Sequence, residues 1–262
     1  MHNFCKVFNL SNQYVDYSKG WRYQKAISEK IHQTYRNDGD SFRHAIILLQ
    51  HPSIYTLGRN ASTKHLKFNT TESANRVVRV ERGGEVTWHG PGQLVAYPIL
   101  NLNHLKKDLH WLASNLEQSV IDTLRLYNIS GERSSVNTGV WVGTNKISAV
   151  GVTASRWITM HGISLNVHCD LSPYNHITPC GIEVEGRHVC SMHQFIQQPD
   201  ALSALRIEDV ASKWLYHLLQ VFQLQEDVNN MDGMSHISQQ LQYLDDLVAK
   251  NPDIHNMQLQ YL

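Results

Sequence analysis

The chain has 262 residues, and its 23 Lys and Arg balance its 23 Asp and Glu, so the formal net charge is zero. A neutral chain lacks the basic excess that nucleic acids and anionic membranes select, so neither is expected as a partner. The hydrophobic content of 42% excludes wholesale disorder, and the length suits one large globular domain.

The first half of the chain combines amphipathic helices with short apolar strands. Apolar residues at steps of three and four from Tyr17 to Tyr35 predict a helix, which Asn37-Asp38-Gly39 ends. Three apolar runs predict strands, at 45–49, 77–80 and 94–100. Pro98 is expected near the end of its strand or on a sheet edge, because proline cannot donate to a strand ladder. A second helix is predicted over 109–124.

The second half begins with a predicted hairpin. Its strands, 139–143 and 146–152, flank the turn Thr144-Asn145, and Lys146 begins the second strand. A further strand is predicted over 163–167 and helices over 210–221 and 237–248. Because strands and helices do not alternate regularly, the sequence predicts an α+β fold, a mixed sheet covered by helices.

Three absences set expectations about the cellular setting. The longest apolar run, Ala45–Leu49, is far shorter than a membrane span needs, and Met1–Leu10 has no signal-peptide core. The four cysteines form no CxxC pair, so we expect a reducing compartment. His168 beside Cys169 could suggest a metal, but no His or Cys pair has ligand spacing, and no metal site is predicted.

A glycine-rich segment runs from Arg82 to Gln93. Its four glycines let the backbone approach a ligand closely, and Arg82, Thr87 and His89 supply directional polar groups. The alternative is a tight turn between two strands. The pattern matches neither a dinucleotide nor a triphosphate loop, so a pocket for a small or apolar ligand fits it better.

Cys180 stands between Pro179 and Gly181. A lone cysteine is usually an inert packing residue, but this proline fixes φ and this glycine permits unusual backbone geometry. Together they aim a side chain and leave room beside it. We therefore hypothesise that Cys180 is a nucleophile, whose thiol needs a nearby cation to lower its pKa.

Several residues could supply that cation, namely Lys146, His89, His161 and His176. Each also has a structural interpretation, as a surface lysine or a hydrogen-bonded histidine. The residues alone leave Cys-Lys, Cys-His and Cys-His-Asp arrangements open.

Four motifs in chain order resemble the octanoyl transferase (LipB-type) family of lipoate biosynthesis. They are Arg82–Ile99, Gly139–Val142 with Lys146–Gly151, Thr159–Asn166 and Pro179–Ile182, within a resemblance over about Val7–Phe222. The family is part of the biotin/lipoate protein ligase superfamily, so the resemblance also implies an α+β fold. It assigns residues 1–225 to the catalytic domain and leaves the Gln- and Asn-rich residues 226–262 as a peripheral extension.

The resemblance implies that an octanoyl or lipoyl group moves from acyl carrier protein, through a thioester on Cys180, to a lysine of a lipoyl domain. Lys146 matches the lysine that lowers the pKa of this cysteine, and no cofactor is expected. The implied acceptors are the lipoyl domains of 2-oxoacid dehydrogenase complexes and the H protein of glycine cleavage. The compartment is expected to be cytoplasmic, or mitochondrial or plastid if a transit peptide is missing.

The resemblance also implies three substrate-binding stretches: Arg82, Gly83, Gly84, Glu85, Val86, Thr87, Trp88 and His89; Ala149, Val150 and Gly151; and Gly162, Ile163 and Ser164. Backbone N–H groups near Cys180 and Gly181 are the expected oxyanion site. Three residues depart from the family pattern. Thr153 stands where Arg or Lys is frequent, Ser148 replaces a frequent Ala, and Glu85 is acidic.

Elementary chemistry agrees with such a transfer. Exchange of an acyl group between a thioester and a thiolate has little net free-energy cost, and amide formation is downhill, so ATP is not needed. Three alternatives are an ATP-dependent ligase of the same superfamily, with a dispensable Cys180, a non-catalytic partner of lipoyl domains or acyl carrier protein, and a cysteine hydrolase that releases free octanoate.

Overall fold

The computed structural model describes residues 3–37, 42–70, 76–135, 137–179, 188–196, 205–227 and 236–262. Its main sheet contains β1 (Phe4–Tyr14), β2 (His44–Gln50), β6 (Gln93–Leu100), β7 (Glu132–Arg133), β8 (Val140–Val142), β9 (Asn145–Ser155), β10 (Ile158–Asn166), β11 (His188–Val189) and β12 (Gln225–Glu226). The strand order is β12-β1-β2-β6-β10-β9-β8-β7, and β11 pairs with β9. Parallel and antiparallel pairs both occur, so the sheet is mixed.

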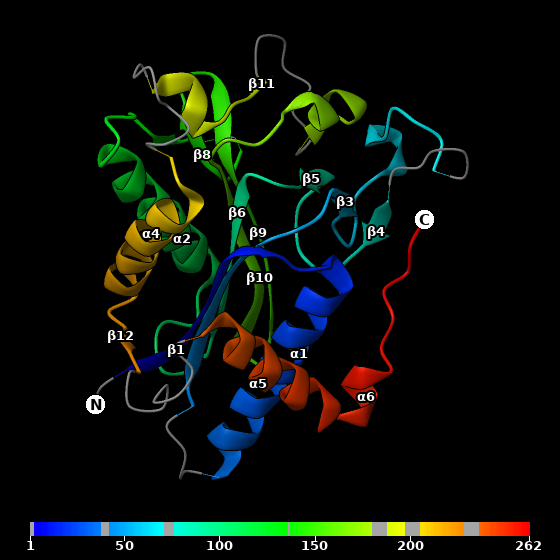
Figure 1. The fold of residues 1–262 in the computed structure, drawn as a ribbon, viewed down its shortest axis with the longest axis vertical. Coiled ribbons are helices and arrows are strands. Elements are labelled where there is room, and N and C mark those ends of the chain that lie inside the picture. Colours follow the sequence, from blue (N-terminus) through cyan, green and yellow to red (C-terminus); the bar gives the residue numbers. More distant parts are fainter. Residues whose placement is uncertain are drawn as a thin grey trace.

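Two helices cover each face of this sheet. Figure 1 shows α2 (Leu109–Arg125) and α4 (Ile207–Val221) on one side, and α1 (Tyr17–Asn37) and α5 (Ile237–Ala249) on the other. The buried side chains of β2 alternate between the two cores: Ile46 and Leu48 pack towards α2 and α4, and Ile47 packs towards α1 and α5. This period of two explains why the strand is apolar throughout.

A smaller sheet lies beside the main one. It contains β3 (Ile54–Leu57), β4 (Val77–Arg79) and β5 (Thr87–His89), in the order β4-β3-β5. The glycine-rich segment connects β4 to β5 and continues into β6. Three short 3₁₀ turns complete the described elements around this region: η1 (Thr63–His65), η2 (Ser172–His176) and η4 (Met192–Phe195).

The predicted α+β class is confirmed, and so are the predicted helices and strands, with bounds that differ by a few residues. The predicted helix stop lies partly outside the described residues, and α1 is described to Asn37. Among the described strands, six were not predicted: β1, whose polar residues break the alternation, and the short β3, β5, β7, β11 and β12.

Pro98 is the informative position of β6. It lies near the end of the strand, as predicted, but β6 runs between β2 and β10, so the sheet-edge alternative is wrong. Pairing of β6 with β10 ends at Ala96, and the Thr159 hydroxyl continues it by donating to Pro98 O (2.7 Å) and accepting from Leu100 N (2.8 Å). A side chain therefore replaces the ladder where proline has no N–H.

The C-terminal residues pack on the rest of the molecule. Leu244 and Val248 of α5 belong to the same core as α1, and α6 (Pro252–His255) follows. The last residues then run along β4, where Leu262 N donates to Val77 O at 3.0 Å. The division of the chain at residue 225 stays a prediction.

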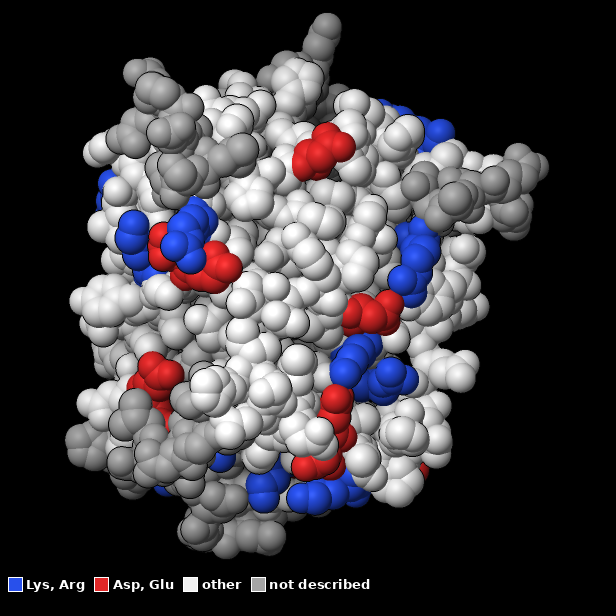
Figure 2. All heavy atoms as spheres, in the orientation of Figure 1, with Lys and Arg blue, Asp and Glu red and all other residues white. Residues whose placement is uncertain are grey.

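Figure 2 shows one face of the molecule, on which basic and acidic side chains lie next to one another in small groups within a largely uncharged surface. The described ion pairs include Lys19–Asp245 at 3.0 Å and Arg76–Asp16 at 3.1 Å. Among the described residues, no helix has the length and apolar character that a bilayer crossing requires.

We predict that Thr159→Val destabilises the fold by about 2 kcal/mol, because it leaves a buried carbonyl and a buried N–H without a partner. Thr159→Ser keeps the hydroxyl and should restore most of this loss. Chemical denaturation of the three proteins measures the effect. Equal stability of Thr159→Val and the wild type would show that the strands pair there without the side chain.

Candidate functional site

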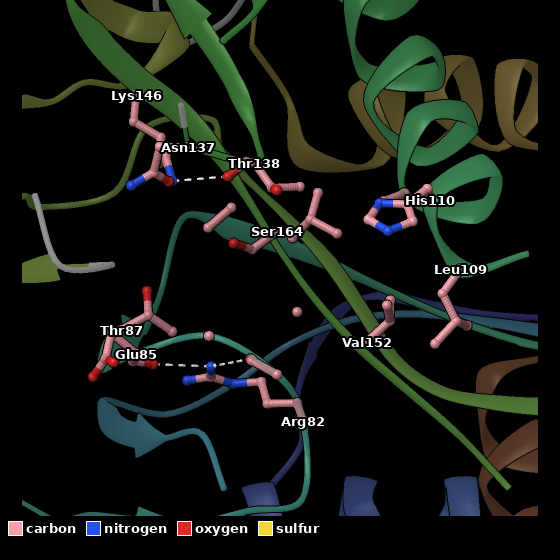
Figure 3. Close-up of a pocket in the computed structure, with 16 residues that line it drawn as sticks. Arg82, Glu85, Thr87, Leu109, His110, Asn137, Thr138, Lys146, Val152 and Ser164 are labelled. Atoms are coloured by element: carbon pink, nitrogen blue, oxygen red, sulfur yellow. Dashed lines mark hydrogen bonds between the residues drawn. The ribbon is translucent and has the colours of Figure 1, made fainter. Parts of the chain in front are cut away.

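The candidate site lies along β9, next to the point where its pairing with β8 ends. β8 pairs with β9 only as far as Ser148, and beyond it this edge of β9 borders a pocket of about 420 Å³, until Gly83 N donates to Val152 O at 3.1 Å. The pocket is lined by Arg82, Gly83, Gly84, Glu85 and Thr87 of the glycine-rich segment, by Leu109, His110 and Ala113 of α2, by Asn137 and Thr138, and by Lys146, Ala149, Val150, Gly151, Val152 and Ser164. Figure 3 shows these walls, with His110 facing the glycine-rich segment across the strands. The volume is typical of a site for a small ligand.

Arg82 organises the glycine-rich wall of the pocket. Its guanidinium donates to the carbonyl oxygens of Gly83 (2.9 Å), Glu85 (3.0 Å) and Thr56 (2.6 Å), and the side chain is 7% exposed. Gly151 gives it room, because a Cβ there would lie 2.8 Å from Arg82 Cδ. The segment is therefore both a fixed turn and a pocket wall, so the two interpretations of the sequence hold together.

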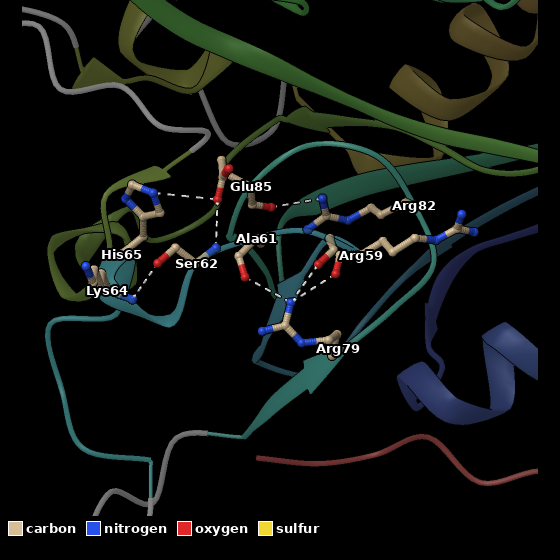
Figure 4. Close-up of polar contacts among 9 residues, drawn as sticks. Arg59, Ala61, Ser62, Lys64, His65, Arg79, Arg82 and Glu85 are labelled. Atoms are coloured by element: carbon tan, nitrogen blue, oxygen red, sulfur yellow. Dashed lines mark hydrogen bonds and ion pairs between the residues drawn. The ribbon is translucent and has the colours of Figure 1, made fainter.

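A second arginine fixes the loop behind this wall. Arg79 donates to the carbonyl oxygens of Gly58 (3.0 Å) and Ala61 (2.9 Å), and Glu85 accepts from Ser62 N at 3.2 Å (Figure 4). These contacts tie residues 58–62 to β4 and, through Glu85, to the glycine-rich segment. The acidic Glu85, a departure from the family pattern, thus has a structural contact.

Lys146 is buried at the inner end of the pocket and is 3% exposed. Its Nζ donates to Asn137 Oδ1 and to Thr138 O (2.9 Å), and it lies 5.1 Å from the centre of the Trp141 ring. The hairpin turn before β9 brings these groups together, since β8 and β9 are antiparallel neighbours. A buried lysine needs such acceptors, because the loss of water is costly.

The backbone beside Lys146 is held by α2. Gly139 has φ of +131°, and a Cβ there would lie 2.4 Å from Ser148 O and 3.2 Å from Lys146 Cε. Its N–H donates to Glu117 Oε1 at 2.7 Å, and the other oxygen of Glu117 lies 3.3 Å from Arg133 Nε. Position 139 therefore requires a glycine, and the hydrogen bond to Glu117 fixes its backbone against α2.

A small cavity of about 10 Å³ continues the pocket inwards. It is lined by Thr87, Lys146, Ser148, Ala149, Ser164, Asn166, Tyr174, Pro179 and Val189. Cys180 and Gly181 lie outside the described residues, together with the oxyanion site expected there. Pro179, the residue bonded to Cys180, shares this cavity with Lys146.

The structure brings together most of the predicted site residues, but not all. The pocket is lined by Lys146, Arg82, Gly83, Gly84, Glu85, Thr87, Ala149, Val150, Gly151 and Ser164, whereas Val86, Trp88, His89, Gly162 and Ile163 are not among its lining residues. Val86 and Ile163 pack in cores, and a Cβ on Gly162 would lie 2.1 Å from Ala96 O. Trp88 packs in the same core as Val86, and His89 is buried, so these five residues belong to the packed interior.

The sequence did not point to Asn137, Thr138, Ser148 or the first turn of α2 as parts of the pocket. Leu109 and His110 looked like ordinary residues of an amphipathic helix, and only the packing of α2 beside β9 places them there. The one available signal was the pair Asn137-Thr138 directly before the Gly139 motif.

The other cysteines are poor nucleophiles. Cys5, Cys169 and Cys190 are all buried, and burial raises the pKa of Cys169 and of Cys190 to about 12. Burial also raises the pKa of Cys5 well above its ordinary value. None of the three is a thiolate near neutral pH.

Two of the histidines considered as cations are neutral. Burial, together with nearby His51 and Arg82, lowers the pKa of His89 to about 3, and His89 Nδ1 donates to Gln93 Oε1 at 2.7 Å. Burial also lowers the pKa of His161, against the opposing effect of Glu81. Of Lys146, His89 and His161, only Lys146 lines the pocket.

Comparison with known proteins identifies relatives of this chain. The family model of the lipoyl protein ligase A/B catalytic domain matches residues 16–219. A chloroplastic octanoyltransferase of Arabidopsis thaliana is 44% identical over 84% of this chain and 80% of its own length. An octanoyltransferase of Synechocystis is 45% identical over 73% of this chain and 81% of its own.

Solved structures share the fold at low sequence identity. A lipoate-protein ligase A bound with ATP has a TM-score of 0.64 at 14% identity, over 95% of both chains. Protein Ta0514 of T. acidophilum with bound lipoic acid has a TM-score of 0.63 at 14% identity, over 95% of this chain and 96% of its own. The superfamily fold implied by the sequence is thereby confirmed.

We predict that the fold loses stability as the pH falls from 7 to 5. Burial lowers the pKa of His51 to about 4 and that of His89 to about 3, so the unfolded chain binds protons below about pH 6.5 while these folded histidines stay neutral. Each contributes a loss of about 2 kcal/mol at pH 5. Denaturation at the two pH values measures the loss.

His89→Gln should reduce that loss by about 2 kcal/mol, because it removes one of the buried histidines whose pKa is lowered, while His44, His51 and His161 remain. His255→Gln, at an exposed position, should leave the loss unchanged. The same pH dependence in His89→Gln and in the wild type would contradict a neutral, buried His89.

Proposed function

Because this chain belongs to the lipoyl protein ligase A/B catalytic domain family, we propose that it is an octanoyltransferase, which moves an octanoyl or lipoyl group from acyl carrier protein to a lysine of a lipoyl domain. One observation carries the chemistry. The buried Lys146 and Pro179, which is bonded to Cys180, line the same small cavity at the inner end of the pocket. The names of the relatives support the substrate, and the cavity supports the roles of Lys146 and Cys180.

In the first half-reaction, the Cys180 thiolate attacks the carbonyl carbon of the octanoyl thioester. A new carbon–sulfur bond forms to Cys180, the bond to the carrier sulfur breaks, and the carrier thiolate takes up a proton. The ammonium of Lys146 stabilises the attacking thiolate electrostatically. The pocket along β9, lined by Ala149–Val152 and the glycine-rich segment, holds the acyl chain.

In the second half-reaction, the amine of the acceptor lysine attacks the Cys180 thioester. The amide bond forms, the carbon–sulfur bond breaks, and the amine gives up a proton. Once the thiolate charge is gone, the Lys146 ammonium releases its proton to solvent, and the neutral Nζ, at the inner end of the pocket, accepts the proton of the amine. The two steps need no ATP and no cofactor.

The partners of the reaction are octanoyl-acyl carrier protein as donor and lipoyl domains of 2-oxoacid dehydrogenase complexes and the glycine cleavage H protein as acceptors. The family match ends at residue 219, which supports a catalytic domain within 1–225 and an extension over 226–262, whose helix α5 packs in the same core as α1. We place the protein in the cytoplasm, or in a plastid or mitochondrion if it carries a transit peptide. A chloroplastic relative supports the plastid alternative.

We predict that octanoyl-acyl carrier protein raises the mass of the wild type by one octanoyl group, located on the peptide that contains Cys180. Cys180→Ala should lose this adduct and the transfer to a lipoyl domain. Cys169→Ala is the matched control and should keep both, because that buried thiol does not line the pocket. ATP-dependent octanoylation by Cys180→Ala would favour a ligase.

We predict separate defects for two Lys146 variants. Lys146→Ala should raise the pH at which Cys180 is alkylated, because the positive charge beside the thiolate is lost. Lys146→Arg keeps a charge, so self-acylation should survive while transfer to the acceptor lysine is lost, since a guanidinium cannot act as a base near neutral pH. An alkylation profile of Lys146→Ala that overlays the wild type would show that Lys146 is not the activating cation.

A further inference from the structure

Two hydroxyl groups in the small inner cavity have no hydrogen-bond partner within the part of the chain that the structure describes. They are Oγ1 of Thr87 and Oγ of Ser148, and these residues are 6% and 2% exposed. Buried polar atoms are almost always hydrogen-bonded, and leaving one unpaired is costly. Two of them in one cavity, beside a buried lysine, point to a ligand atom that pairs with both.

The volume of this cavity and its hydrogen-bond donors indicate what kind of ligand atom it binds. Its volume of about 10 Å³ suits a single water-sized group and not a chain. Both hydroxyls can donate, and an ammonium on Lys146 has three N–H groups, of which Asn137 Oδ1 and Thr138 O accept two. The cavity therefore suits one acceptor oxygen at the inner end of a larger pocket.

We propose that the Ser148 and Thr87 hydroxyls bind the carbonyl oxygen of the transferred acyl group. This inference rests on the proposed acyl transfer and adds to it a role for Ser148, on the strand that carries Lys146. The acyl chain lies in the larger pocket, and the carbonyl oxygen enters the small cavity. Both hydroxyls come from rigid elements, β9 and β5, which fix their positions.

The hydroxyls act when charge develops on that oxygen. As the Cys180 sulfur bonds to the carbonyl carbon, one electron pair of the C=O bond moves to the oxygen. The two hydroxyls donate hydrogen bonds to this oxygen and keep their protons. The electron pair then returns, and the bond to the carrier sulfur breaks. Donors placed in advance stabilise such a charge more than they stabilise the substrate.

The test is the single-turnover rate of self-acylation by octanoyl-acyl carrier protein, followed by intact mass, together with the Tm of each protein. Ser148→Ala should lower the rate by at least about 10-fold, in line with the loss of one oxyanion donor. Its Tm should not fall, because the hydroxyl has no described partner in the fold. Thr87→Val should behave in the same way, and Thr87→Ser should restore the rate.

Ser119→Ala is the matched control. Ser119 is fully buried on α2, away from the pocket, and its hydroxyl donates to Leu116 O and accepts from Trp214 Nε1. This variant should lose Tm and keep the acylation rate of the folded protein. Ser148→Ala should instead keep its Tm and lose acylation rate. This difference distinguishes a hydroxyl that binds the substrate from one that stabilises the fold.

Two results would overturn the inference alone: a wild-type acylation rate in Ser148→Ala, or a fall in its Tm as large as that of Ser119→Ala. If the wild type forms no adduct with octanoyl-acyl carrier protein, the proposed function fails first, and the inference fails with it. The wild-type reaction therefore distinguishes the two failures.

Discussion

The burial of Lys146 is the constraint on which the pocket depends. An amine that is removed from water must find acceptors within the protein, and the residues just before β8 supply Asn137 Oδ1 and Thr138 O. That backbone is held in turn by Glu117 of α2, through the N–H of Gly139. Residues 137–139 thus connect Lys146 of β9 to Glu117 of α2. The first turn of α2 borders the same pocket.

The glycine-rich segment meets a different requirement. It must stay open to a ligand on one side and remain fixed without many packed side chains of its own. Arg82 resolves this, because its guanidinium binds three backbone carbonyls and replaces the missing side-chain contacts. Trp88 and His89 then anchor the end of the segment in buried surroundings. A segment that is flexible by its glycine content is therefore held in one conformation and forms one wall of the pocket.

Much of this arrangement could be predicted from the sequence, because its signals are local. The predicted hairpin placed Lys146 next to the turn, although the turn residues are Gly143 and Thr144 and β9 already begins at Asn145. The apolar periods located both covering helix pairs. Contacts between distant segments gave no such signal. The helix pattern of 109–124 gives no sign of the role of Glu117, yet this residue is 6% exposed and holds Gly139. Similarly, nothing in Thr87 or Ser148 indicates that their hydroxyls meet in one cavity, since that depends on β5 lying beside β9.

The pairing of β1 with β12 joins residues more than two hundred positions apart, since Phe4 is in register with Gln225. Asp227 N also donates to Cys5 O at 2.9 Å across the same edge. During synthesis, β1 can pair with β2 early, but its other edge stays open until nearly the whole chain has left the ribosome. Closing so long a loop is slow, because the entropy of the intervening chain is lost before the contact forms. The strands that border the pocket lie between these two segments in the sequence, so they can assemble while that outer edge of the sheet is still unpaired.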